Sequence, residues 1–156
     1  MWALSNTSNK GLQSRSYRFD FQNTLSATGV WLAPLGVADR AAATIVLDDK
    51  GKKTSDVAVS DRVNRGEQVL AADLLFTGDA APQNPGPILY AEMLAATGDR
   101  PLGLEVAQLI RLARWLQQTS GAPKIRVEAA GIRNQVAAQL AAALEPSLFS
   151  EVVIRG

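Results

Sequence analysis

Apolar and polar positions alternate in two segments near the start of the chain. Residues 17–21 carry an apolar side chain at every second position, which is typical of a strand with one buried face. Residues 29–34 form a second apolar segment, which ends at Pro34. The two segments together predict an antiparallel strand pair at one edge of a sheet.

The strands predicted later in the chain have a different pattern. Residues 43–47 are a continuous run rich in β-branched residues and bounded by charged residues, which suits a strand covered on both faces in a parallel sheet. Residues 68–74 and 124–130 predict two further core strands. Residues 151–154 predict a last strand close to the end of the sequence.

Helix-like patterns occupy the intervals between these core strands. We predict helices over residues 55–64, 87–98 and 136–144, each bounded by glycine or proline. The clearest amphipathic helix covers residues 104–118. Its predicted buried stripe is Leu104, Ala107, Leu109 or Ile110, Leu112 or Ala113, and Leu116, and its predicted polar face is Glu105, Gln108, Arg111, Arg114 and Gln118.

The order of the elements indicates the fold class. Two antiparallel strands are followed by alternating strands and helices. This order predicts an α/β fold with a mostly parallel open sheet, helices on both faces and the antiparallel pair at the N-terminal edge. We expect residues 15–156 to form one domain and the polar residues 1–14 to form a flexible arm.

The composition is that of an ordinary globular protein, with 156 residues, 47% of them apolar and 20% charged. The net charge is +1 and the basic residues are scattered, so we expect neither nucleic acid nor a membrane surface as a partner. The longest apolar runs are shorter than the roughly 20 residues that a bilayer span needs. The first residues do not have the pattern of a signal peptide, so the sequence predicts a soluble protein and indicates no compartment.

Cysteine and histidine are both missing from the sequence. Without cysteine, disulfides, thiolate nucleophiles and cysteine-based metal sites are excluded. Without histidine, a Ser–His–Asp triad cannot form within this chain. The acidic residues show no spacing typical of metal ligands, so we expect neither a metal nor another cofactor.

Three segments, in this order along the chain, resemble the α/β-hydrolase superfamily, and in particular its acetylxylan esterase and dipeptidyl-peptidase-like branch. Residues 44–51 are similar to the strand and turn that supply one oxyanion-hole amide. Residues 69–79 are similar to the strand that precedes D-x-x-G-x-G, of which Asp73 and Gly78 match. Residues 126–138 are similar to the strand, elbow and helix that hold the nucleophile, and residues 100–103 (RPLG) add to the resemblance.

The chain departs from this family at the elbow itself. The family pattern is G-x-S-x-G, whereas this chain has Gly131, Ile132, Arg133, Asn134 and Gln135. Arg133 stands at the serine position, and a guanidinium stays protonated and cannot attack an acyl carbon. The resemblance also implies that the family's acid and histidine follow strands later than the sixth, where this sequence ends. We therefore expect a truncated hydrolase-like fold of carboxylic-ester hydrolase ancestry, either catalytically deficient or a fragment of a longer esterase.

Two places on this scaffold remain candidates for binding a small anion. Asp48, Asp49, Lys50 and Gly51 form a charged turn at the carboxyl end of a strand, where open α/β sheets bind ligands. The backbone amides near Lys50 and Gly51 would form half of an anion-binding notch. Arg133 and Asn134 would add a positive charge and free amides at the start of a helix, which predicts a carboxylate, sulfate or phosphate ligand. The alternative interpretation is a solvated loop and a surface arginine.

The role of Asp73 and Gly78 is also open at this level. Asp73 is either a carboxylate that shapes a turn or a ligand-binding acid. An unfamiliar catalytic site built from Asp, Lys and Ser side chains is a further alternative. In that site Lys50, Lys52 or Lys53 would act as the base only if it were strongly desolvated.

The last predicted strand leads to a hypothesis about assembly. If residues 151–154 form an edge strand, their apolar side chains and unpaired backbone lack the next layer of a sheet. A second copy of the chain would cover them by strand pairing or swapping. We therefore predict a homodimer at micromolar concentration, formed through this C-terminal strand.

Overall fold

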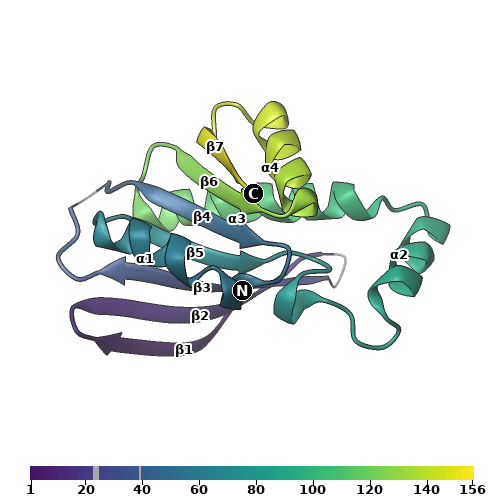
Figure 1. The fold of residues 1–156 in the computed structure, drawn as a ribbon, viewed down its shortest axis with the longest axis horizontal. Coiled ribbons are helices and arrows are strands. Elements are labelled where there is room, and N and C mark those ends of the chain that lie inside the picture. Colours follow the sequence, from purple (N-terminus) through teal and green to yellow (C-terminus); the bar gives the residue numbers. More distant parts are fainter. Residues whose placement is uncertain (23–24, 39) are drawn as a thin grey trace.

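The computed structural model of the chain describes residues 1–22, 25–38 and 40–156. Within these residues, seven strands form one mixed sheet in the order β1-β2-β3-β5-β4-β6-β7 (Figure 1). The strands are β1 (Trp2–Asn9), β2 (Leu12–Asp20), β3 (Ser26–Pro34), β4 (Ala43–Asp48), β5 (Gln68–Asp73), β6 (Ile125–Ala130) and β7 (Phe149–Arg155). The helices are α1 (Asp56–Asn64), α2 (Pro87–Ala96), α3 (Pro101–Ser120) and α4 (Ile132–Leu144), and two short 3₁₀ turns, η1 (Lys52–Thr54) and η2 (Gly78–Ala80), follow β4 and β5.

The pairing of the strands confirms the predicted fold class. β4 pairs in parallel with β5 and β6, and β6 pairs in parallel with β7. β1, β2 and β3 pair antiparallel, and β3 joins the parallel part antiparallel to β5. Every residue of β5 and all but the last of β4 are buried, because both faces of these central strands are covered. This two-sided burial explains their nearly continuous apolar sequences.

The N-terminal residues correct the predicted flexible arm. Instead of an arm over residues 1–14, β1 and β2 form a hairpin that turns at Lys10 and Gly11, both with positive φ. All side chains of β1 are exposed, so backbone hydrogen bonds rather than apolar burial hold this strand. A strand with neither face buried shows no alternation of apolar and polar residues, and its sequence therefore looks like that of a loop.

The helices form a layer on each face of the sheet (Figure 1). α3 and α4 pack together on one face, and α1 contacts β3, β4 and β5. α2 lies at the periphery and buries none of its residues. The main core lies between the sheet and the α3–α4 layer, and it includes Ile45, Leu47, Leu70, Val127, Leu109, Leu112, Leu116, Ala137, Ala138 and Ala141.

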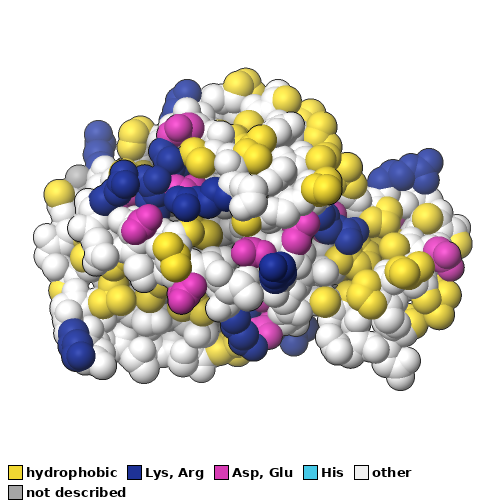
Figure 2. Space-filling view, viewed as in Figure 1, with side chains coloured by type: hydrophobic (Ala, Val, Ile, Leu, Met, Phe, Trp, Pro, Cys, Tyr) yellow, Lys and Arg dark blue, Asp and Glu magenta, His cyan; other side chains and the backbone are white. Residues whose placement is uncertain are grey.

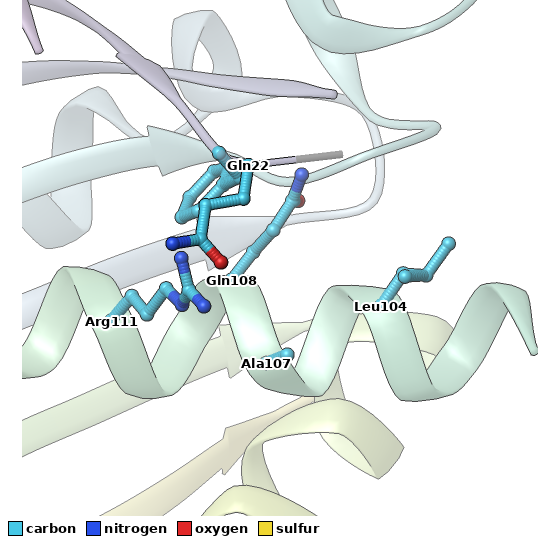
Figure 3. Close-up of a pocket in the computed structure, with 6 residues that line it drawn as sticks. Gln22, Leu104, Ala107, Gln108 and Arg111 are labelled. Carbon is cyan, nitrogen blue, oxygen red and sulfur yellow. The ribbon is translucent and has the colours of Figure 1, made fainter. Parts of the chain in front are cut away.

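Helix α3 differs from its prediction in the face that it buries. Glu105 and Gln108, assigned to the polar face, are buried, whereas Ala107 is exposed. Gln108 extends from α3 toward the sheet, beside a small hollow that Gln22 and Arg111 also line (Figure 3). Its Oε1 atom accepts a hydrogen bond of 2.8 Å from the amide of Leu75. The prediction failed because the loops that cover the first turns of α3 are not visible in the pattern of the helix itself.

Candidate functional site

The predicted corner between a strand and a helix is present at the carboxyl end of β6. β6 ends at Ala130, Gly131 turns the chain with φ 81° and ψ 149°, and α4 begins directly at Ile132. The helix therefore starts four residues before the predicted position, 136. Arg133, which stands where the family has its nucleophile, lies in the first turn of α4 with a helical backbone. In the family pattern the strained backbone belongs to the nucleophile, whereas here the residue with positive φ is a glycine.

The start of α4 is capped by Asp49, which follows β4. Asp49 Oδ2 accepts a hydrogen bond of 3.0 Å from the amide of Arg133, and Oδ1 accepts one of 2.9 Å from the amide of Asn134. A carboxylate is favourable at this position, because the first amides of a helix are unpaired and its dipole is positive there. The carboxylate comes from the turn after β4, more than eighty residues earlier in the sequence, so no local capping motif at the start of α4 predicts it.

Asp49 fits closely against the corner. A Cβ atom added to Gly131 would lie 2.3 Å from Cγ of Asp49. Only glycine allows this approach, and only glycine readily adopts the backbone angles found here. The contact explains why position 131 requires a glycine.

The predicted anion-binding notch has internal acceptors for all of its amides. Those of Arg133 and Asn134 donate to Asp49. The amide of Lys50 donates to the side chain of Asp48 at 2.8 Å, and that of Gly51 donates to the carbonyl of Asp48 at 2.8 Å. The sequence analysis took these amides to be free, whereas each of them donates to an acceptor within the chain. An external anion would have to displace a carboxylate that is covalently part of the chain.

The side chain of Arg133 points toward the start of α3. Its Nε atom lies 2.7 Å from Oε1 of Glu105, and its guanidinium carbon lies 4.6 Å from the centre of the Phe76 ring. Phe76 follows β5, has a positive φ of 72° and packs edge-on against Tyr90 of α2. Arg133 thus joins the corner to α3 and to the loop after β5 by an ion pair and a cation–π contact.

Glu105 is the residue of this site that the sequence analysis missed. Its side chain is only 2% exposed, and burial raises the pKa of its carboxyl from 4.5 to about 7, although the charge of Arg133 acts in the opposite direction. Its Oε2 atom has no hydrogen-bond partner among the described residues. An acidic residue on an amphipathic helix usually faces water, so only the fold identifies this one as buried.

A second polar cluster is centred on Asp73 at the end of β5. Its carboxylate accepts hydrogen bonds from the amides of Lys52 (2.6 Å) and Asp79 (2.9 Å). A Cβ atom on Gly78 would lie 2.4 Å from this carboxylate, so the loop after β5 wraps tightly around it. These contacts favour the interpretation that Asp73 and Gly78 shape the turns after β4 and β5.

Lys52 is fully engaged in the same cluster. Its Nζ atom donates to Asp73 (2.5 Å), Asp79 (2.7 Å) and the hydroxyl of Thr28 (2.9 Å), which uses all three hydrogens of an ammonium group. Lys53 donates to the other oxygen of Asp79 at 2.8 Å. Hydrogen bonds from the two lysines lower the pKa of Asp79 to about 2. The arrangement is a structural ion-pair network rather than a free base beside a nucleophile.

Two hollows lie near the residues described above, and Lys52 and Asp79 of the polar cluster line part of the larger one. A groove of about 670 Å³ lies on the α1 face of the sheet and has Val30, Leu32 and Ala71 among its lining residues. A second hollow of about 430 Å³ lies between α2 and Arg133. In the described part of the chain, no three acidic side chains are arranged to hold a metal ion. None of the described helices combines the length and apolar character needed to cross a membrane.

The cap on α4 leads to a testable prediction. Asp49→Ala should lower the free energy of unfolding by roughly 2–3 kcal/mol, because two amides at a helix start lose a charged acceptor. Denaturation in urea measures this loss. Asp48→Ala is the matched control, since the Asp48 side chain accepts one bond in an exposed turn, and it should cost about 1 kcal/mol or less. Equal losses in the two variants would contradict a special role for Asp49.

Comparisons with proteins of known structure agree with this fold. The chain superimposes with a TM-score of 0.73 on a Bacteroides fragilis protein assigned as an acetyl xylan esterase, at 14% sequence identity over 90% of this chain. The acetyl xylan esterase from Paenibacillus sp. R4 gives a TM-score of 0.66 at 15% identity over 93% of this chain. A cold-adapted esterase from an Arctic intertidal metagenomic library gives 0.69 at 15% identity over 99% of this chain. No protein-family model matches the sequence, and no curated protein matches it.

The chain spans only part of these proteins. It covers 44% of the Bacteroides protein, 49% of the Paenibacillus esterase and 63% of the cold-adapted esterase. The structural likeness therefore establishes a partial α/β-hydrolase fold of the kind found in esterases. The chemistry of the site has to be argued from the residues themselves.

Proposed function

We propose that this chain is an esterase-like α/β-hydrolase scaffold without acyl-transfer chemistry at its strand–helix corner, and that it works as a non-catalytic binding or assembly domain. The observation that carries the proposal is the position of Asp49. Its carboxylate accepts the amides of Arg133 and Asn134, at the corner where the resemblance predicts the nucleophile and the oxyanion hole.

The nucleophile position supports this proposal. Arg133 carries no group that attacks an acyl carbon, and its guanidinium is held by Glu105 and by the ring of Phe76. Nucleophilic catalysis needs a hydroxyl, thiol, amine or carboxylate beside a base that activates it. Arg133 therefore stabilises the corner instead of reacting there.

The amides of the corner support the same conclusion. An oxyanion hole works because donors are free and pre-oriented toward a negative charge that develops in the transition state. In this chain the donors already bind the negative charge of Asp49. A developing oxyanion would meet a carboxylate instead of two free N–H groups, and the repulsion would raise the barrier.

The histidine base of a serine hydrolase is also missing, and the buried carboxyl of Glu105 beside the corner is paired with Arg133. The sequence contains no histidine. Lys52, which the alternative of a non-standard site would use, donates all three of its hydrogens to neighbouring oxygen atoms. Loss of a complete triad in serine hydrolases costs a factor on the order of 10⁶ in turnover. We therefore favour a non-catalytic domain over an enzyme with a non-standard site. We do not propose that the corner binds a small anion, because its amides already donate to Asp49.

The proposal predicts that the folded chain hydrolyses esters no faster than a control protein. A chromogenic acetyl ester and a fluorophosphonate probe measure turnover and serine labelling. We expect no saturable hydrolysis and no labelled serine. Arg133→Ser, which restores G-x-S, should remain inactive, because Asp49 still occupies the amides and no histidine is available within the chain.

The control is the heat-unfolded chain at equal concentration, which reports the background reaction of lysines with the activated ester. Saturable hydrolysis that requires the folded chain, together with labelling of one serine, would overturn the proposal. Activity that appears only in Arg133→Ser would show that the corner is intact apart from one side chain, and would also contradict the role given to Asp49.

A further inference from the structure

The buried carboxyl of Glu105 belongs to a cluster with more acidic than basic groups. Its Oε1 atom lies 2.7 Å from Nε of Arg133, whereas Oε2 has no hydrogen-bond partner among the described residues. The negative charge of Asp49, which caps α4, acts on the same carboxyl and favours its neutral form. One guanidinium thus lies beside two carboxyl groups, and ionisation of Glu105 leaves the cluster with one negative charge in excess.

The other elements around Glu105 do not balance this excess. The loop after β5 contributes the uncharged Phe76, and α3 itself contributes the neutral, buried Gln108. Helix α2 contributes Tyr90, which packs against Phe76, and Glu92, which lines the hollow between α2 and the corner. The side chains around α2, at the right of the view, are mainly hydrophobic (Figures 1 and 2). An ionised Glu105 that stays buried therefore finds no second cation among the described residues.

The first turn of α3, which leads directly to Glu105, has little to hold it in place. The helix begins at Pro101 after Arg100, whose side chain makes no capping hydrogen bond, and its first turn contains no acidic residue. Gly103 lies within this turn, and glycine is less favourable in a helix than any residue except proline. On the other side of Glu105, two amides at the start of α4 are bound to Asp49. Unwinding of α3 is therefore an easier route for water to Glu105 than movement of α4.

Unwinding of residues 101–104 is enough to expose the carboxyl. The amide of Leu104 donates to the carbonyl of Arg100 at 3.0 Å, and helical pairing joins the amide of Glu105 to the carbonyl of Pro101. When these two bonds break, Glu105 becomes part of a short exposed segment. Its side chain then turns toward water and away from Arg133.

We propose that the first turn of α3 is a proton-controlled switch, which is wound when Glu105 is neutral and unwinds when Glu105 is ionised. Water hydrates both oxygens of the carboxylate in the unwound state, and this compensates for the helical hydrogen bonds that are lost. Unwinding also releases the guanidinium of Arg133 from its ion pair at the corner. The switch thus links the loss of one proton to the appearance of a free positive charge beside the corner.

The direction of the pH dependence follows from burial. In the wound state, burial raises the pKa of Glu105 from 4.5 to about 7, whereas in the unwound state the carboxyl is in water and keeps the pKa of 4.5. Below pH 4.5 both states are protonated, and the opening constant of the turn does not depend on pH. Between the two pKa values the opening constant rises about tenfold per pH unit, and above pH 7 it levels off.

Native-state hydrogen exchange of single amides, followed by NMR, tests the switch. After correction for the intrinsic pH dependence of exchange, the opening constants of the amides of Leu104, Glu105 and Val106 should rise about 100-fold from pH 4.5 to pH 7.5. Glu105→Gln should abolish this rise, because glutamine does not titrate. The amides of α1, which packs elsewhere on the sheet, are the internal control for local fluctuations and should behave alike in both proteins.

Urea at low concentration separates the switch from global unfolding. Unwinding of one turn exposes little surface, so its opening constant should hardly change with urea, whereas that of core amides rises steeply. Equal pH dependence in wild type and Glu105→Gln would overturn the proposal. So would amides of residues 104–106 that exchange only together with the core.

A second variant tests the location of the opening. An added Cβ atom on Gly103 would meet no atom closer than 3.6 Å, so Gly103→Ala fits the wound turn. It should lower the opening constant about 5-fold at every pH, because alanine favours the helix, and leave the pH dependence unchanged. Gly86→Ala, where an added Cβ would also meet no atom within 4 Å, is the matched control and should leave residues 104–106 unaffected.

An unchanged opening constant in Gly103→Ala would show that a different segment exposes Glu105, and would overturn the assignment to the first turn of α3. Exchange is measured without any substrate. The outcome is therefore independent of the proposed lack of catalysis.

Discussion

Gly131→Ala is expected to lower the free energy of unfolding by roughly 3–5 kcal/mol, one of the largest effects of a single methyl group in this chain. Two costs add at this position. Alanine is strained at φ 81° and ψ 149°, and its Cβ atom would lie 2.3 Å from Cγ of Asp49. Asp49 cannot retreat without losing its bonds to α4. Urea denaturation followed by circular dichroism measures the effect.

Two further variants separate these costs. Gly86→Ala, at φ −64° with no atom within 4 Å of an added Cβ, should change stability by about 0.5 kcal/mol or less. In an Asp49→Gly background the clash disappears, so Gly131→Ala should cost only the backbone strain of roughly 1–3 kcal/mol. A Gly131→Ala variant as stable as the parent would show that the corner is loosely packed and would contradict the close fit described for Asp49.

Glu105→Gln is expected to remove a large pH dependence of stability. The carboxyl of Glu105 has its pKa raised from 4.5 to about 7 in the folded chain, chiefly by burial. Below pH 4.5 the group is protonated in both the folded and the unfolded chain, and the stability that it contributes is fully present. As the pH rises through 7 the unfolded chain has already ionised, and the folded chain loses roughly 3 kcal/mol of unfolding free energy.

The other titrating groups are the same in wild type and Glu105→Gln. The difference between their free energies of unfolding at each pH therefore reports the loss caused by Glu105 alone. Glutamine does not titrate. The free energy of unfolding of the variant, relative to that of the wild type, should therefore rise by roughly 3 kcal/mol between pH 4.5 and pH 7.5. Glu92→Gln, on the exposed helix α2, is the control and should follow the wild-type profile. Arg133→Met should shift the midpoint of the loss to higher pH, because Arg133 favours the ionised carboxylate. Parallel profiles of wild type and Glu105→Gln would contradict the buried position of Glu105.

Both predictions concern the same corner, where Gly131 approaches Asp49 and Arg133 lies against Glu105. In an enzyme of this fold the corner presents a reactive side chain and leaves its amides free for the substrate. In this chain the amides bind Asp49, and the side chain of Arg133 binds Glu105.

The order of the strands and helices from β2 onward was predictable from the sequence alone. The apolar runs of β4 and β5, the proline at the start of α2 and Gly121 after α3 are local signals that act over a few residues. The glycine at 131 and the arginine at 133 also indicated, before any coordinates, a turn into a helix that holds no nucleophile. Local sequence determines these features because backbone conformation and side-chain chemistry depend mainly on the residue and its near neighbours.

The partners of these residues were decided by the tertiary structure. Asp49 caps α4 from the turn after β4, and Glu105 is buried because the corner and the loop after β5 cover the start of α3. β1 becomes a strand because β2 offers its edge, although none of its side chains is buried. The cap on α4 and the burial of Glu105 depend on contacts between segments that are distant in the sequence. The β1–β2 pairing depends on backbone hydrogen bonds, which leave no pattern in the side chains. Such contacts arise only when the sheet brings the carboxyl ends of its strands together, so no pattern along the chain records them.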